Sequence, residues 1–389
     1  MNVSKGPAFA GPFYCRDTRY RVLFCLSVDC RLAGMKKILL VLGAVTSFNS
    51  LHAQPVGLKL ANAVPCTSVK DQAQSPTCWV FGTNSLFESD LLKIKGRSFN
   101  FSEMFIARYA YIDKANTFLS SGGKTYFEGG GQFHDVIRVI NKYGIVPEEV
   151  YNGDPDGAGY HDHKKLDTAM QHYIRGLLKQ EKRSLNATEL QQVNDTLDKY
   201  LGKVPVRFIF DKQRYTPKTF AMQWLPFSND YAEVVSFSDK PLYKHFILDD
   251  KYNWARDSFY NISLADMKQL ADTALQKGWS VGWEGDVTEP GFHYFGGYAS
   301  LPDSLYEYDT QRLTNYKTEA TERDHMLHLV GGGKDSCGHQ WYYMKNSWGN
   351  FGEYQGYMYM DENYFRMKSV ILFVNKRGLS NELRKKLGF

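Results

Sequence analysis

Two residues near the start of the chain have the chemistry of a cysteine enzyme. Cys78 opens an amphipathic pattern that runs to about Lys95, and Gln72 precedes it by six positions. A cysteine in the first turn of a helix lies at the positive end of the helix dipole, which favours the nucleophilic thiolate. The Gln72 amide can donate to a developing oxyanion. By itself, Cys78 followed by Trp79 is more typical of a buried structural cysteine beside a core tryptophan than of a nucleophile.

The partners of such a nucleophile occur much later in the chain. A cysteine nucleophile needs a base, and the base needs a group that orients it. His325 opens one strand pattern, and Asn346 directly follows another, at 340–345. If the two strands pair in antiparallel fashion, His325 lies close to Asn346, whose carbonyl accepts from the imidazole N–H. Trp348 can cover that hydrogen bond from water.

The elements that position these residues form two groups. The front half is helical and the back half is rich in strands, which predicts an α+β fold with two lobes and a site between them. The expected helices are 78–95, a helix opened by Ser102, 132–143, 164–180, 189–201 and 263–277. The expected strands are 206–210, 231–237, 246–249, 279–283, 325–330, 340–345, 356–359 and 369–374.

The ordered motifs resemble those of a known family. Gln72…Cys78-Trp79, Asp324-His325 and Asn346-Ser-Trp-Gly349 are similar to the papain-like cysteine peptidases. Other stretches resemble the bleomycin hydrolase/aminopeptidase C branch of that clan: Phe101-Ser-Glu, Asp113-Lys-Ala-Asn116, Gly129-Gly-Gly-Gln132, Lys142-Tyr-Gly-Ile-Val-Pro147, Tyr260-Asn-Ile-Ser263 and Gly285-Asp-Val287. The resemblance implies a papain-like two-lobed fold, with Cys78 at the N-terminus of a central helix and a second, antiparallel β-barrel-like lobe.

The resemblance also implies a role for each matched residue. Cys78 is expected to be the nucleophile, His325 the general base and then acid, and Asn346 the group that orients the imidazole. The oxyanion hole is expected to consist of Gln72 and the Cys78 N–H. The substrate-binding residues are expected to be Gly130, Gly131 and Trp348. The family's reaction proceeds through an acyl-enzyme and needs no cofactor.

The first 53 residues contain a targeting signal. Met35-Lys-Lys precedes a short apolar run, and Leu51-His-Ala53 suits signal-peptidase cleavage before Gln54. We therefore expect an over-long gene model in residues 1–34, a signal peptide in 35–53 and a peptidase domain in 54–389, with a helical insertion at about 160–202. The protein is then exported, to the periplasm or beyond. The apolar run is too short to span a membrane.

Composition restricts the partners. The formal charge is +5, but residues 1–53 hold seven Lys and Arg against two Asp, so the remainder is neutral and offers no nucleic-acid surface. No Cys or His cluster has the spacing of metal ligands, so no metal is expected. The expected partner is a peptide or protein substrate. The sequence leaves open the oligomeric state and whether Cys66 pairs with Cys337.

The sequence thus predicts an exported cysteine peptidase, with an aminopeptidase and an endopeptidase both open. In the family branch, a longer C-terminal arm limits attack to free N-termini, and the tail 379–389 is shorter and basic. Two alternatives use the same residues differently: an amidase acting on a non-peptide substrate, and a catalytically silent peptide-binding protein.

Overall fold

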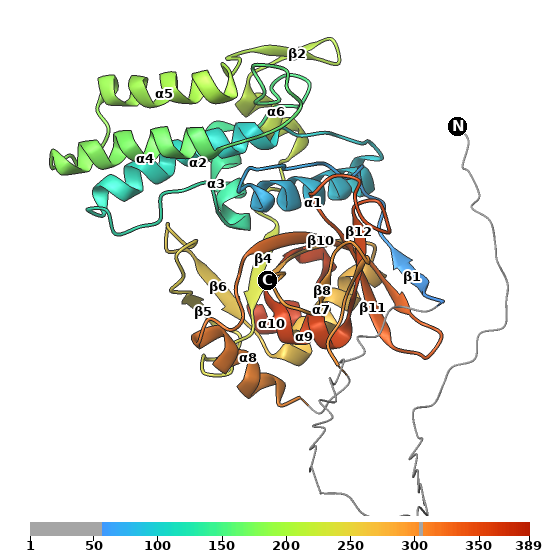
Figure 1. The fold of residues 1–389 in the computed structure, drawn as a ribbon. Coiled ribbons are helices and arrows are strands. Elements are labelled where there is room, and N and C mark those ends of the chain that lie inside the picture. Colours follow the sequence, from blue (N-terminus) through green and yellow to red (C-terminus); the bar gives the residue numbers. More distant parts are fainter. Residues whose placement is uncertain (1–56, 303–305) are drawn as a thin grey trace, which may run out of the picture. The chain divides into compact units, whose positions relative to one another are not determined.

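Helix α1 (Cys78–Lys95) is the element around which the fold is arranged (Figure 1). The computed structural model describes residues 57–302 and 306–389. The expected signal peptide and the segment before it lie outside these residues. From Trp79 to Leu91 every residue of α1 is buried, including polar ones. A helix buried on all sides contacts both halves of the molecule, and Gly96 ends it in a left-handed conformation (φ 63°).

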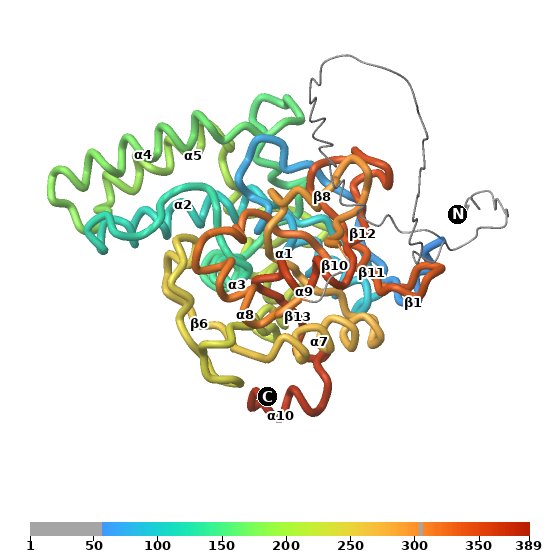
Figure 2. The backbone as a smooth tube through the Cα atoms, turned by 60° about the horizontal axis from the view of Figure 1, so that its bottom comes forward, coloured from blue at the N-terminus to red at the C-terminus, as the bar shows by residue number. Residues whose placement is uncertain are grey.

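A helical lobe packs against one side of α1. Ser102 caps α2 by accepting from the Phe105 N–H at 3.0 Å, and Asn186 and Glu189 form the expected capping box of α5. Helices α4 and α5 lie side by side at the outer edge of this lobe (Figures 1 and 2). The elements are α2 (Glu103–Ser120), α3 (Phe133–Tyr143), α4 (Lys164–Lys179), α5 (Ala187–Leu201), β2 (Phe208–Phe210), β3 (Gln213–Tyr215) and α6 (Pro217–Trp224).

A mostly antiparallel sheet forms the second lobe. Its strand order is β5-β6-β4-β13-β7-β10-β11-β12-β9-β8, with β1 paired to β10. The strands are β1 (Lys59–Ala63), β4 (Tyr231–Val235), β5 (His245–Ile247), β6 (Ser258–Asn261), β7 (Val281–Gly285), β8 (Phe292–His293), β9 (Tyr298–Ala299), β10 (His325–Lys334), β11 (Gln340–Lys345), β12 (Tyr357–Asp361) and β13 (Ser369–Asn375). The helices of this lobe are α7 (Leu264–Gln276), α8 (Tyr308–Lys317), α9 (Glu362–Lys368) and α10 (Asn381–Leu387).

The buried side chains form two hydrophobic cores. One core gathers side chains of α1 to α6 together with sheet residues such as Tyr231, Ile371 and Phe373, and the other gathers further side chains of the sheet with α7, α9 and α10. The α+β class and the two-lobed arrangement are therefore confirmed. Strand β10 packs against α1, so the junction of the lobes lies beside Cys78. In the residues described, we find no helix with the length and apolar character needed to cross a membrane.

Most expected elements form, with shifted ends. Helix α1 and strand β11 have the expected bounds, whereas the helix opened by Ser102 continues to Ser120. The strand expected at 279–283 is displaced to Val281–Gly285. Four helices were not foreseen, namely α6, α8, α9 and α10. All are short, with seven to ten residues, so tertiary contacts rather than a long apolar periodicity determine them.

The turn after α3 gives a stability prediction. Gly144 has φ +94° and ψ −158°, and its missing side chain admits the Pro217 carbonyl, which accepts from the Ile145 N–H at 3.2 Å. We expect Gly144→Ala to lower the free energy of unfolding by about 3 kcal/mol or more, from backbone strain plus collision. The matched control is Gly157→Ala, where φ is +67° and no atom lies within 4 Å, with an expected cost of about 1 kcal/mol. Urea denaturation of both variants measures the difference, and equal costs would contradict the prediction.

Candidate active site

Cys78 is the first residue of α1 and is partly exposed. Its N–H is one of the first four of the helix, which have no partner within the helix, so it can donate to a bound group. The next residue fixes the segment, because Trp79 is buried and its Nε1 donates to the Gly129 carbonyl at 2.9 Å. The helix start thus holds the sulfur at the junction of the two lobes.

His325 and Asn346 lie together at adjacent strand ends. Strands β10 and β11 pair in antiparallel fashion, and His325 Nε2 lies 2.7 Å from Asn346 Oδ1. Since the amide oxygen can only accept, the proton is on Nε2, and Nδ1 is left as the basic nitrogen. The Trp348 ring lies over the imidazole with centroids 4.4 Å apart. His325, Asn346 and Trp348 therefore lie next to one another, as the sequence predicted. Their roles remain predictions.

Gln72 is held beside this motif by Ser347. The Gln72 N–H donates to the Ser347 carbonyl at 2.8 Å, and Ser347 Oγ donates to Gln72 Oε1 at 2.7 Å. Nε2 carries two N–H bonds, and one donates to the Ser75 carbonyl at 2.9 Å. The positioning role of Ser347 was missed from the sequence, although the residue stood inside the quoted Asn-Ser-Trp-Gly motif. These contacts aim the amide without using both of its donors.

The glycine segment 129–131 packs directly against the Cys78 turn. A Cβ at Gly129 would collide with Pro76, and a Cβ at Gly131 would lie 2.8 Å from the Trp79 ring. At Gly130 a Cβ would lie 2.9 Å from Tyr252. Close backbone approach is what glycine permits. Gly129 and Gly131 therefore pack against residues that flank Cys78 in the sequence, and Gly130 lies between them.

Burial opposes every single charge at this site. It raises the pKa of the Cys78 thiol to about 12, where hydrogen bonds from the backbone of Met326 and Trp79 work against the shift. Burial likewise lowers the pKa of His325 to about 4, although the hydrogen bond to Asn346 favours the charged ring. Burial thus disfavours a lone thiolate and a lone imidazolium, whereas transfer of the proton from the thiol to the imidazole creates both charges together without changing the net charge.

A buried polar cluster lies behind α1. Ser85 Oγ lies 2.8 Å from His328 Nδ1 and receives a hydrogen bond from Lys345 at 2.7 Å. With Lys70, Glu88 and Glu103 these residues line a cavity of about 10 Å³, room for one water molecule. The cluster joins α1 to β10 and β11, and no sequence motif pointed to it.

Cys66 has no part in a disulfide with Cys337. Its thiol is free and lies 3.4 Å from the Tyr357 hydroxyl. The pairing that the sequence left open is therefore not formed.

The fold and the chemistry of this site define a class, and comparison with known proteins supplies the family. The chain belongs to the Peptidase C1-like family, whose model matches residues 50–388. It is accordingly a cysteine-type peptidase of the papain-like clan, and the bleomycin hydrolase/aminopeptidase C branch fits.

Relatives are distant but cover most of the chain. Aminopeptidase G of Lactobacillus delbrueckii subsp. lactis is 22% identical, covering 86% of this chain and 87% of its own. Aminopeptidase C of Lactococcus lactis subsp. cremoris is 24% identical, covering 81% and 82%. The crystal structure of PepW from Lactobacillus rhamnosis matches with a TM-score of 0.70 and 19% identity, over 85% of this chain and 84% of that one. This last similarity confirms the papain-like fold.

The two opposed pKa shifts give a pH prediction. In the unmodified protein, proton transfer to His325 makes the thiolate available without loss of a proton to water. In His325→Ala the Cys78 thiol keeps its raised pKa, so we expect alkylation by iodoacetamide to slow at least about 100-fold at pH 7. The rate in the variant should then climb steadily through the alkaline range, whereas the unmodified protein shows a plateau. Mass spectrometry of the Cys78 peptide measures both profiles, and superimposable profiles would refute the coupling.

Proposed function

We propose that this protein is an exported cysteine peptidase that acts through Cys78, His325, Asn346 and Gln72. The observation that carries the proposal is the convergence of a helix-initial cysteine, the His325–Asn346 hydrogen bond of 2.7 Å and the held Gln72 amide at one junction. A domain of residues 54–389, with the helices near 160–202 as an insertion, and export directed by residues 35–53 are parts of this proposal.

In the proposed mechanism, His325 Nδ1 takes the proton from Cys78 Sγ, and the thiolate attacks the scissile carbonyl carbon. The oxygen becomes an oxyanion that accepts from the Cys78 N–H and from the second N–H of Gln72 Nε2. His325 returns the proton to the departing amine, and the C–N bond breaks. Water then attacks the thioester carbonyl and gives a proton to His325. The C–S bond breaks, the acid is released, and His325 returns the proton to Cys78 Sγ.

Asn346 and Trp348 act on His325 in this scheme. The amide oxygen of Asn346 adds no charge but keeps the proton on Nε2 and the ring in one orientation. Trp348 excludes water from that hydrogen bond. The oxyanion donors contribute most in the transition state, because the negative charge then develops on the substrate oxygen beside buried groups.

We further propose that the activity is that of an aminopeptidase. Support comes from relatives named aminopeptidase G and aminopeptidase C, which align over more than four fifths of this chain. Endopeptidase or amidase activity with the same residues are the competing outcomes of the experiments below.

The nucleophile is tested by substitution. Cys78→Ala removes the sulfur from the first residue of α1 and favours the helix, so the fold is retained. We expect kcat/KM on any peptide substrate to fall by at least about 10⁴-fold, since the triad members act as a unit. The unmodified protein should also be inactivated by an epoxide that alkylates active-site thiolates. Full activity in Cys78→Ala would refute the proposed chemistry.

The position of cleavage is tested with a pair of substrates. A fluorogenic peptide with a free amino terminus should be hydrolysed at least about tenfold faster than the same peptide carrying an acetyl group. The protein used starts at Gln54, and Cys78→Ala serves as the blank. Equal rates on the two peptides would identify an endopeptidase, and mass spectrometry of a peptide library distinguishes both from an amidase.

A further inference from the structure

The segment from Asp249 to Asp257, which joins β5 to β6, lies against the glycine segment beside Cys78. We call it the 249–257 loop. Its Tyr252 ring occupies the direction in which a Gly130 side chain would point, 2.9 Å from an ideal Cβ. The same ring packs edge-on against Tyr126, with centroids 5.1 Å apart. On the helical side, therefore, the loop covers the backbone that is expected to bind substrate.

The loop is also tied to the sheet side, close to His325. Asp250 forms an ion pair with Arg323, two residues before His325, and accepts from the Tyr316 hydroxyl at 3.3 Å. The Arg323 guanidinium lies 5.6 Å from the centre of the Tyr252 ring. The loop thus reaches from Gly130 on one wall to Arg323 on the other.

Buried polar contacts close the space beneath the loop. Arg323 Nε lies 3.0 Å from Glu284, which faces Met326 in the β7–β10 pairing. With its amide oriented to suit both partners, Gln132 donates to Glu284 at 3.1 Å and accepts from Arg323 at 2.8 Å. Glu284 and Arg323 are both buried. This set joins β7, the segment before β10 and the residue that follows the glycine segment.

The loop is held rigidly. Asn253, itself buried, donates to the Leu248 carbonyl at 3.0 Å and to the Asp257 carbonyl at 2.8 Å. The buried Trp254 donates from Nε1 to Asp135 at 2.8 Å. These hydrogen bonds restrain the loop both within itself and against α3.

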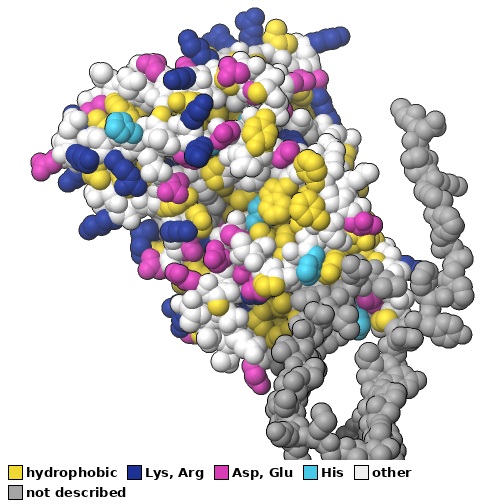
Figure 3. Space-filling view, in the orientation of Figure 1, with side chains coloured by type: hydrophobic (Ala, Val, Ile, Leu, Met, Phe, Trp, Pro, Cys, Tyr) yellow, Lys and Arg dark blue, Asp and Glu magenta, His cyan; other side chains and the backbone are white. Residues whose placement is uncertain are grey.

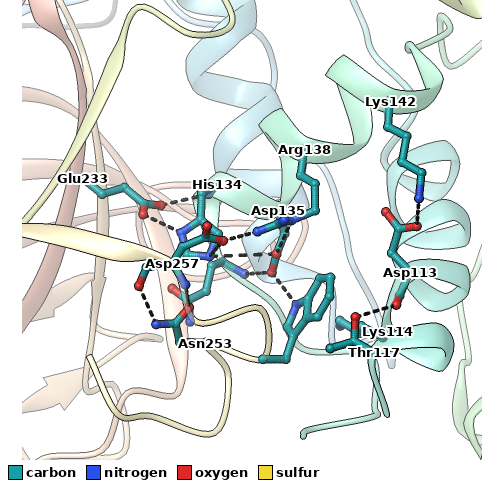
Figure 4. A network of polar contacts seen from close by, with 12 residues as sticks. Asp113, Lys114, Thr117, His134, Asp135, Arg138, Lys142, Glu233, Asn253 and Asp257 are labelled. Carbon is teal, nitrogen blue, oxygen red and sulfur yellow. Dashed lines mark hydrogen bonds and ion pairs between the residues drawn. The ribbon is translucent and has the colours of Figure 1, made fainter. Parts of the chain in front are cut away.

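An ion-pair network fixes the end of the loop to α3 (Figure 4). Asp257 pairs with Arg138 and lies 3.3 Å from His134, whose Nδ1 is 2.6 Å from Glu233. Burial opposes the charge on His134, but Glu233 outweighs it and raises the pKa of His134 to about 9. His134, Asp135 and Asp257 have ligand atoms within 4.8 Å of one another. Two protein cations, His134 and Arg138, balance these carboxylates, so we interpret the group as an anchor for the loop.

The direction of the substrate follows from the proposed mechanism, on which this inference rests. The departing amine takes its proton from His325, so the leaving side of the substrate lies towards His325 and Trp348. The acyl side then extends the other way, along Gly131 and Gly130.

Figure 3 shows hydrophobic side chains gathered over the region of α1, β10 and β12, whereas Lys and Arg spread over α4 and α5.

We propose that the 249–257 loop, through Tyr252, is the stop that limits how many residues precede the scissile bond. A chain that binds along Gly131 meets the Tyr252 ring at Gly130 and ends there. The accepted substrates are peptides with one or two residues on the acyl side. The loop therefore makes an exopeptidase from a cleft that would otherwise bind a longer chain.

The test compares substrates of different length in two loop variants. The substrates are a single amino acid, a free tripeptide and an acetylated tripeptide, each coupled to the same coumarin and with the same residue at the scissile bond. In the unmodified protein kcat/KM should fall with each added group. In Tyr252→Ala the ratio of acetylated tripeptide to single amino acid should rise at least tenfold. Asp250→Ala, which removes the tether to Arg323, should shift the same ratio in the same direction.

The matched control is Tyr200→Ala, since Tyr200 is a half-buried tyrosine on α5, in the outer part of the helical lobe. It should leave the ratio unchanged, and urea midpoints verify that all variants are folded. An unchanged ratio in both loop variants would overturn the inference, as would equal rates of the unmodified protein on the acetylated tripeptide and the single amino acid. Either result leaves the peptidase function standing. Failure of that function is recognised separately, by hydrolysis that persists in Cys78→Ala.

Discussion

The structure depends on the satisfaction of polar groups buried along α1. Glu88 accepts from the Phe101 N–H at 2.9 Å and from Thr67 at 2.5 Å, and Asp90 accepts from Tyr231 and Asn375 at 2.5 and 3.0 Å. An unpaired buried carboxylate is costly, so these partners are obligatory. They come from both lobes and from segments distant in sequence. These contacts therefore fix the position of the helix relative to the strands. Because Cys78 is the first residue of the helix, they also fix the position of Cys78.

The same dry surroundings determine the chemistry at the end of the helix. A site that disfavours each separate charge still permits a proton to move from sulfur to ring, because the pair remains neutral. In the proposed mechanism, the Cys78 N–H and Gln72 Nε2 then donate hydrogen bonds to the substrate oxygen, which carries the first negative charge without a positive partner. Ser347 links the two functions, since it belongs to the turn after Asn346 and also holds Gln72. The segment Asn346-Ser347 thus orients both the imidazole that transfers the proton and the Gln72 amide that is proposed to bind the oxyanion.

Sequence reasoning was accurate where local signals determine structure. Gly96, Ser102 and Asn186 fixed helix ends because caps depend on neighbouring residues. The approach of His325 to Asn346 followed from two strand patterns and a hairpin. The 249–257 loop was not foreseen, because its conformation depends on partners in α3, β4 and the segment before β10. Nor could the raised pKa of the Cys78 thiol be predicted, since the burial that causes it is a tertiary property.

The hydrogen bond between Asp90 and Asn375 has a consequence for how the protein is made. Its partners are 285 positions apart, so α1 cannot complete its buried contacts until β13 has left the ribosome. Such distant pairing slows folding and leaves intermediates exposed. During synthesis the thiol of Cys78 is therefore present on a helix whose surroundings are incomplete, and His325 is itself far downstream. A nascent chain therefore carries Cys78 without its expected base until His325 has been synthesised, and without the full contacts of α1 until Asn375 has followed.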